Sequence, residues 1–183
     1  MNLLKILIGG CSSIGKTTAA ELLSKHLGVT HCSLDTMRNS FGHPIFREFD
    51  SPEVWDNDVE DLVRIVKQMS IQLRPIIEKW CINTQSGLLE GEGIEPDMVS
   101  RMSYINNLKV IYIIETDAER LHTTLYGKAK KYRDLSEERQ KKVLAMNTEY
   151  SKFIQSEAVK FNQPWVYSQP WETLHHRILK AIS

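Results

Sequence analysis

A glycine-rich stretch near the start of the chain carries residue types that bind polyphosphate. In IGGCSSIGKTTAA, the pattern G-x-x-x-x-G-K-[ST] is satisfied by Gly10, Gly15, Lys16 and Thr17. Such glycines let backbone N–H groups turn inward around phosphate oxygens, while the lysine supplies charge and the hydroxyl can bind Mg²⁺. The alternative is a glycine-rich turn with a surface lysine. We expect nucleotide phosphates to contact Gly10, Cys11, Ser12, Ser13, Ile14, Gly15, Lys16, Thr17 and Thr18.

A second group of reactive side chains lies in SLDTMR, where Asp35 and Arg38 follow a short apolar run. An arginine there can grip a phosphate or carboxylate with two hydrogen bonds. The aspartate can accept a hydroxyl proton or help to hold a metal. We expect both residues to contact a substrate. The structural alternative is a helix-capping aspartate beside a solvated arginine.

A third group lies in LLEGEGIEP, where Glu90 ends an apolar run and Glu92 and Gly93 follow. Because the carboxyl ends of parallel strands share one edge of a sheet, we expect Glu90 to face the phosphate loop. There it would hold Mg²⁺ together with Thr17. Glycine at 93 would let the backbone approach a ligand, so Glu92 and Gly93 are expected on the substrate side. An exposed turn with two glutamates is the alternative.

Charge is unevenly distributed in two segments. Acidic residues dominate from Glu48 to Asp61, which is favourable at a helix N-terminus and carries no functional conclusion. Basic residues dominate a later segment, which is either a solvated helix end or a lid whose cations close over a phosphoryl group. Of these, Lys128 and Arg133 are the expected contributors; the segment contains Lys128, Lys130, Lys131, Arg133, Arg139, Lys141 and Lys142.

Two sets of ring-bearing residues complete the candidates. The side chains of His43, Phe46 and Trp55 could wall an acceptor pocket, although Trp55 also fits the apolar stripe of a helix. The pair His175 and His176 lies far from these motifs in the sequence, and we assign it no function.

Alternating strands and helices must position these side chains. Apolar runs predict strands at Leu3–Ile8, Val29–Leu34, in GLLEGEG, at Lys109–Glu115 and in PWVYS. Helical periodicity predicts helices at Lys16–Leu27, from Ser51 to Trp80 with Pro75 kinking or dividing it, and at Ala118–Tyr126, Ser136–Phe161 and Trp171–Ile182. This alternation predicts an α/β three-layer sandwich with a five-stranded parallel sheet.

The amino-acid composition does not indicate a particular class of macromolecular partner. Lysine plus arginine and aspartate plus glutamate both number 23 in 183 residues, so net charge favours neither nucleic acid nor a membrane. No apolar run approaches the roughly 18 residues of a spanning helix, and no signal peptide is evident, so we expect a cytoplasmic protein. The cysteines Cys11, Cys32 and Cys81 are scattered and are expected to be reduced. We expect one domain over 1–183, with an acceptor-binding segment at about 36–82 and a basic lid at about 126–142.

The quoted stretches resemble the small P-loop kinases of the nucleotide and nucleoside kinase-like group. GGCSSIGKTT is similar to their phosphate loop, LDTMR to their acceptor-site D-x-x-R, and PWVYSQPWE to their last strand and adenine-facing loop. Within the group, SLDTMRNSFG, LLEGEGIEPDMV and SKFIQSEAVKFNQPWVYS look most like 2-phosphoglycerate kinase-like proteins. The chain departs from the group at Glu90, where aspartate is frequent, and at Gly127 and Lys128, where the lid often begins with arginine. The resemblance implies the P-loop NTPase fold, ATP and phosphoryl transfer.

The leading hypothesis is an ATP- and Mg²⁺-dependent kinase, monomeric or homodimeric, for a small anionic metabolite such as a phosphorylated hydroxy acid or sugar. Its expected catalytic residues are Lys16, Asp35, Arg38 and Arg133. A nucleoside or nucleoside monophosphate kinase is the alternative within the class. A nucleotide-dependent switch is the alternative outside it, although the chain lacks an N-K-x-D guanine signature.

Overall fold

The computed structural model describes residues 4–41, 51–127, 132 and 134–183. Its five strands form one parallel sheet in the order β2-β3-β1-β4-β5. The strands are β1 (Lys5–Gly9), β2 (His31–Ser33), β3 (Gly87–Glu90), β4 (Leu108–Ile114) and β5 (Trp165–Tyr167). In the register, Ile8 of β1 pairs with Glu90 of β3 on one side and with Ile111 of β4 on the other. The expected five-stranded parallel sheet is confirmed.

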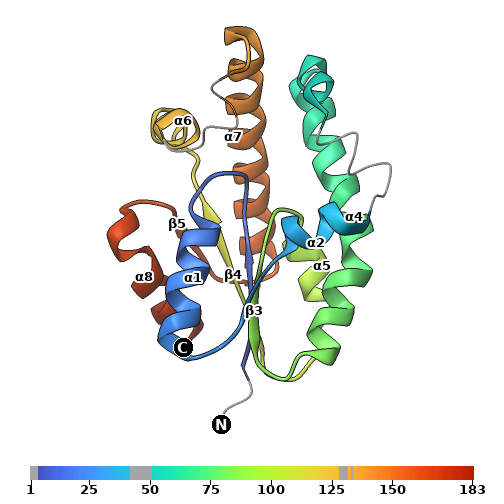
Figure 1. Ribbon diagram of the computed structural model, residues 1–183, viewed down its shortest axis with the longest axis vertical. Coiled ribbons are helices and arrows are strands. Elements are labelled where there is room, and N and C mark those ends of the chain that lie inside the picture. The colour runs from blue at the N-terminus through green and yellow to red at the C-terminus, as the bar shows by residue number, and fades with distance from the viewer. Residues whose placement is uncertain (1–3, 42–50, 128–131, 133) are drawn as a thin grey trace.

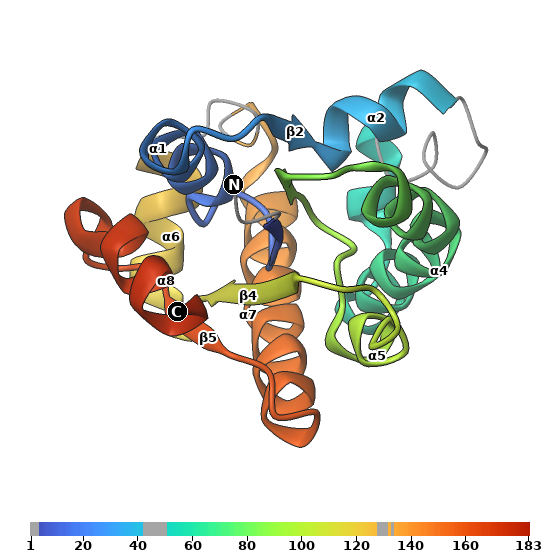
Figure 2. The ribbon, with the colours of Figure 1, turned by 90° about the horizontal axis from the view of Figure 1, so that it is seen from below.

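Helices cover both faces of the sheet. Figure 2 shows α1 and α8 on one face and α4, α5 and α7 on the other, which gives three layers. The described helical elements are α1 (Lys16–Leu27), α2 (Leu34–Phe41), the 3₁₀ turn η1 (Pro52–Asp56), α4 (Val59–Asn83), α5 (Pro96–Ser100), α6 (Ala118–Gly127), α7 (Glu137–Lys160), η3 (Trp171–Thr173) and α8 (Leu174–Ile182). Because both faces are covered, the central strands are near-continuous apolar runs.

The central strands form the core. The side chains of Ile6, Leu7 and Ile8 are fully buried, as are those of Leu88 and Leu89. Figure 1 shows the loops that leave the carboxyl ends of β1 and β3 at the upper edge of the sheet, with the N-terminal parts of α4 and α7 rising beyond that edge. The fold therefore gathers the expected reactive segments at one edge.

Two helix boundaries differ from expectation. The helix expected from Ser51 begins only at Val59, because η1 and a short extended link precede it. Ser51 does cap η1, since its Oγ accepts a hydrogen bond from the Glu53 N–H. The last helix begins at Leu174 instead of Trp171, and η3 occupies the intervening residues.

Pro75 does not divide α4, which continues from Val59 to Asn83. The carbonyl that loses its partner at a proline belongs to the residue four positions earlier, here Ile71, whose side chain is 66% exposed. On the opposite side of the helix, Leu73 and Ile77 are fully buried. Because Ile71 lies on the solvent side of the helix, water can replace the lost hydrogen bond, and packing of the buried side keeps the helix continuous. Among the described residues, no helix is both long and apolar enough to cross a membrane.

Candidate active site

The glycine-rich loop connects β1 to α1 and has backbone conformations that require glycine. Gly10 has φ +137°, and a Cβ there would lie 2.2 Å from the Ile113 carbonyl oxygen. Gly15, the N-cap of α1, has φ +94°. The loop therefore passes tightly over β4 and ends at the N-terminus of a 12-residue helix, where unpaired N–H groups favour an anion.

Lys16 lies at the centre of this loop. Its side chain is buried, and its Nζ donates a hydrogen bond to the Cys11 carbonyl oxygen at 2.6 Å. A buried ammonium requires such partners, because an unpaired charge is costly away from water. Its position within the loop is the one that a lysine needs in order to reach bound phosphates.

Thr17 and Glu90 meet across the carboxyl edge of the sheet. The Thr17 Oγ1 donates to Glu90 Oε1 at 3.1 Å, and His31 Nε2 lies 3.6 Å from the same oxygen. Glu90 is only 1% exposed. Magnesium takes one or two protein oxygens together with phosphate and water ligands, so a hydroxyl and a carboxylate at this spacing fit Mg²⁺. The described residues contain no cluster of three or more His, Cys, Asp or Glu that could hold a metal by itself.

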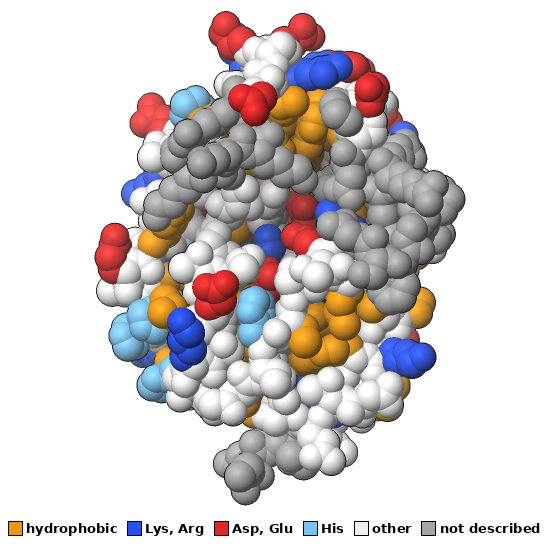
Figure 3. Space-filling model, viewed as in Figure 1, with side chains coloured by type: hydrophobic (Ala, Val, Ile, Leu, Met, Phe, Trp, Pro, Cys, Tyr) orange, Lys and Arg blue, Asp and Glu red, His pale blue; other side chains and the backbone are white. Residues whose placement is uncertain are grey.

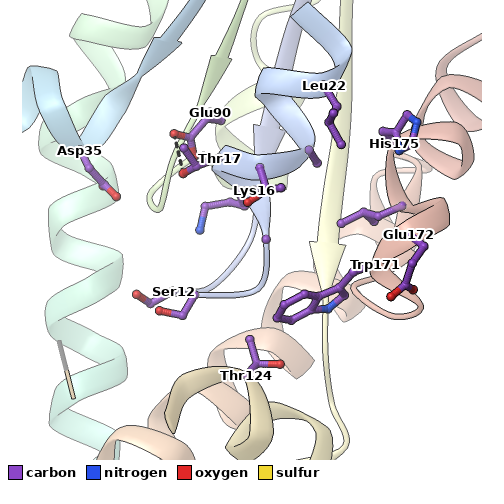
Figure 4. A pocket seen from close by; sticks show the side chains of 15 residues that line it. Ser12, Lys16, Thr17, Leu22, Asp35, Glu90, Thr124, Trp171, Glu172 and His175 are labelled. Atoms are coloured by element: carbon purple, nitrogen blue, oxygen red, sulfur yellow. Dashed lines mark hydrogen bonds between the residues drawn. The ribbon is translucent and has the colours of Figure 1, made fainter. Parts of the chain in front are cut away.

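A cavity of about 610 Å³ surrounds these groups, which is in the range of small-molecule sites. Figure 4 shows Asp35, Glu90 and Thr17 on one side of Lys16, and Leu22, Trp171 and His175 on the other. Figure 3 shows acidic, basic and histidine side chains close together near the middle of the face seen in Figure 1. The lining residues are Ser12, Ser13, Gly15, Lys16, Thr17, Thr18, Ala19, Leu22, Asp35, Glu90, Thr124, Trp171, Glu172, Leu174 and His175.

His175 was given no function from the sequence, yet it lines this cavity. Its position follows from the packing of α8 against α1, a contact that joins distant parts of the chain. Trp171 and Glu172, in the segment that resembles an adenine-facing loop, reach the same end of the cavity. Indole and imidazole rings there provide flat surfaces on which a nucleobase can stack.

The expected substrate residues occupy different environments. Asp35 lines the cavity, with its side chain 48% exposed. Arg38 is buried behind it: one guanidinium nitrogen lies 3.9 Å from Asp35 Oδ1 and 3.3 Å from the Met69 sulfur. Glu92 is also buried. Neither Arg38, Glu92 nor Gly93 lines the described cavity.

Packing accounts for the glycines around Glu92. A Cβ on Gly91 would lie 2.5 Å from the Leu34 side chain, and one on Gly93, at φ +95°, would lie 2.7 Å from Leu73. These contacts seat the loop after β3 against α2 and α4. The expected approach of this backbone to a ligand therefore remains a prediction.

Helix α7 supports the loop from behind through residues that sequence reasoning missed. Asn147 Oδ1 accepts a hydrogen bond from the Ser12 N–H at 3.1 Å, and the Cys11 thiol lies 3.9 Å from Ser151 Oγ. Burial raises the pKa of Cys11 to about 12, so this thiol stays protonated. All three cysteines are free. A polar residue on an amphipathic helix is ordinarily expected on the solvent side, so no local pattern indicates these contacts.

The described part of the basic segment is bound to acidic neighbours. Arg139 Nε and one terminal guanidinium nitrogen each lie 2.7 Å from a carboxylate oxygen of Asp56. Lys141 pairs with Glu137 at 2.8 Å, and Lys142 lies 3.9 Å from Glu138. The other basic positions, Lys128, Lys130, Lys131 and Arg133, lie outside the described residues, as do His43 and Phe46. Trp55 is 6% exposed and joins the core.

Glu95 forms a separate, partly buried cluster below the loop after β3. Its Oε1 accepts hydrogen bonds from Ser70 Oγ at 2.9 Å and from the Tyr150 hydroxyl at 3.0 Å. Burial outweighs these bonds and raises the pKa of Glu95 to about 7. This carboxyl group is therefore only partly ionised at neutral pH.

Comparison with solved structures identifies the fold. Shikimate kinase from Acinetobacter baumannii in complex with shikimate matches with a TM-score of 0.64 and 14% identity, over 97% of this chain and 92% of that one. A gluconokinase from Sinorhizobium meliloti 1021 matches with a TM-score of 0.62 and 11% identity, over 99% and 92%. Shikimate kinase from Bacteroides thetaiotaomicron gives 0.56 and 16%, over 97% of both chains. No protein-family model and no curated protein matches the sequence.

At these identities the likeness establishes the fold, which is the α/β fold of small P-loop kinases. The expected P-loop architecture is thereby confirmed. The narrower resemblance to 2-phosphoglycerate kinase-like proteins stays a prediction, because the structural neighbours compared above are shikimate kinases and a gluconokinase.

Proposed function

We propose that this chain is a kinase that transfers the γ-phosphoryl group of ATP to a small anionic metabolite carrying a hydroxyl group. The observation that carries the proposal is the convergence of a buried lysine, a threonine–glutamate pair and an aspartate around one cavity at the carboxyl edge of the sheet. The fold shared with shikimate kinases and a gluconokinase supports it, because those names denote kinases of small hydroxylated acids.

In this proposal the loop residues hold the nucleotide, and the reaction depends on positioning and charge neutralisation. Backbone N–H groups from Gly10 to Thr18 surround the phosphates, and Lys16 exchanges the Cys11 carbonyl for phosphate oxygens. Thr17 and Glu90 would hold Mg²⁺, which when bound neutralises charge on the phosphate oxygens. The base lies against Trp171 and His175.

Asp35 lines the cavity on the opposite side from the base, and in this proposal it accepts the proton of an acceptor hydroxyl. Arg38 lies behind Asp35, with one guanidinium nitrogen 3.9 Å from Asp35 Oδ1, and in this proposal it supplies the positive charge for the acidic group of the acceptor. Its burial keeps that charge out of bulk water, where it would be screened. Glu92, Gly93 and Arg133 are proposed as further acceptor and lid contacts.

The test is ADP formation from Mg-ATP across a panel of acceptors: shikimate, gluconate, other sugar acids, phosphoglycerates, nucleosides and nucleoside monophosphates. Lys16→Ala is the inactive reference, and Lys25→Ala is its matched control, because Lys25 lies exposed on the same helix. We expect one acidic acceptor to stimulate turnover by wild type and Lys25→Ala, and none to stimulate Lys16→Ala.

Arg38→Ala separates acceptor recognition from nucleotide binding. Its acceptor KM should rise while its nucleotide affinity stays unchanged. A flat response to every acceptor, with nucleotide binding intact, contradicts the kinase and favours a nucleotide-dependent switch. Stimulation by nucleosides alone would leave a kinase but contradict the anionic acceptor.

A further inference from the structure

Tyr132 joins three segments that are distant in the sequence. Its hydroxyl lies 3.0 Å from Ser12 Oγ in the phosphate loop. Its ring packs edge-on against Trp55 of η1, with centroids 5.8 Å apart and an interplanar angle of 87°. Tyr132 is 3% exposed and Trp55 is 6% exposed. The ring is thus buried between the loop and η1, which lies within the expected acceptor segment at about 36–82.

Ser12 is held firmly at its end of this contact. Its N–H donates to Asn147 Oδ1 at 3.1 Å, and Asn147 in turn donates to the Val143 carbonyl at 2.8 Å. Because its backbone is anchored to α7, the direction of the Ser12 side chain is restricted. Ser12 also lines the nucleotide cavity. A change in the direction of the Ser12 side chain would therefore alter its bond to the Tyr132 hydroxyl.

At the other end of this contact, the backbone next to Trp55 is anchored to α7. The next residue, Asp56, accepts two hydrogen bonds from Arg139, each 2.7 Å long, and its carbonyl accepts one from Lys142 Nζ at 3.0 Å. Such a two-bond pair fixes orientation more than it stabilises the fold. With η1 tied to α7, a displaced Trp55 must press on the Tyr132 ring, since packed interiors leave little room to absorb movement.

We propose that Tyr132 is a positioning residue that couples the phosphate loop to the acceptor segment, so that nucleotide binding changes the environment of the Trp55 side chain. The proposal rests on the proposed function, because the coupling serves to align the two substrates. Burial raises the pKa of Tyr132 well above its ordinary value, so the hydroxyl stays protonated and able to donate. The link runs from Ser12 through the Tyr132 hydroxyl and ring to the Trp55 indole.

The test uses fluorine NMR of protein labelled with 5-fluorotryptophan, titrated with a non-hydrolysable ATP analogue and Mg²⁺. The chain has four tryptophans, and Trp55→Phe identifies the Trp55 signal. In wild type, nucleotide should move that signal. Tyr132→Phe keeps the ring contact but removes the bond to Ser12, and Ser12→Ala removes the same bond from the other side. We expect either variant to lose more than about half of the Trp55 shift and to bind nucleotide about five-fold more weakly.

Tyr112→Phe is the matched control. Tyr112 is likewise buried, and its hydroxyl donates to Gln163 Oε1 at 2.9 Å, so this bond joins neither the phosphate loop nor η1. It should lower stability while leaving the Trp55 shift intact. A full Trp55 shift in Tyr132→Phe, with nucleotide still bound, overturns the coupling but not the kinase. Failure of the wild-type chain to bind nucleotide overturns both. If the combined Ser12→Ala, Tyr132→Phe variant binds as weakly as each single variant, the shared bond is confirmed.

Discussion

Glu90→Gln tests the expected magnesium site, because it changes charge while keeping shape. The glutamine oxygen can still accept the hydrogen bond from Thr17, which spans 3.1 Å in the wild-type chain. Glu90 is 1% exposed, so its charge is poorly screened. Two unit charges about 5 Å apart interact by about 3 kcal/mol at an effective dielectric of about 20. Part of that is offset by desolvation of the carboxylate.

Glu90→Gln should therefore weaken Mg²⁺ binding by about 10- to 100-fold, which is the usual loss when a residue that supports a metal is changed. We therefore expect Mg²⁺ to enhance ADP binding about 10- to 100-fold less in Glu90→Gln than in wild type. ADP binding in the presence of a chelator should be unchanged. Stability should be equal or higher, since a buried charge becomes neutral. Calorimetric titration of ADP with and without Mg²⁺ measures the enhancement directly.

Glu115→Gln is the matched control for this experiment. Glu115 is also 1% exposed and directly follows β4, but it bonds Ser168 Oγ at 2.9 Å and does not line the cavity. It should leave the Mg²⁺ enhancement intact. If Glu90→Gln retains the full enhancement, then Glu90 does not support the metal, and its bond to Thr17 is only structural.

Two further predictions concern stability. Gly10→Ala should lower the free energy of unfolding by about 3–5 kcal/mol in urea titrations, because its Cβ would lie 2.2 Å from the Ile113 carbonyl at φ +137°. Gly28→Ala, at φ +66° with nothing within 4 Å, should cost only about 1 kcal/mol, and equal losses would contradict the steric reasoning. The pKa of Glu95 is raised from 4.5 to about 7 in the folded chain, so the unfolded chain loses this proton at a lower pH than the folded chain does. The free energy of unfolding should therefore fall as the pH rises from about 4.5 to 7. Glu95→Gln should remove that part of the pH dependence, and an unchanged slope in the variant would refute it.

The sheet and the loop were predictable because their signals are local. A strand buried on both faces is a short apolar run, and the phosphate loop is defined by glycines and a lysine within eight positions. Glu90 was placed opposite Thr17 by one topological rule, that parallel strands end at the same edge. The structure brings the two side chains within hydrogen-bond distance.

The missed residues all depend on contacts between distant helices. His175 reaches the cavity because α8 packs on α1, and Asn147 reaches Ser12 because α7 crosses behind the loop. The apolar spacing around His175 and around Asn147 is the same as that around a polar residue that faces solvent. The start of α4 was misplaced for a related reason: Trp55 continues the apolar spacing of α4, but it packs against Tyr132 from a separate 3₁₀ turn.

The acidic segment before α4 and the basic segment before and within α7 contact each other, and this contact decides how each is interpreted. Alone, the acidic run before α4 reads as a favourable helix start, and the basic run before and within α7 reads as either a solvated face or a catalytic lid. In the structure they meet: Asp56 accepts hydrogen bonds from Arg139 and Lys142. The Arg139 side chain also holds the pKa of Asp56 below its ordinary value. Arg139 and Lys142 therefore tie η1 to α7, whereas the catalytic role expected of Arg133 stays a prediction for a residue outside the described ranges. Removing this pair with Arg139→Ala should consequently raise the KM for the acceptor, and an unchanged KM would contradict this role of the pair.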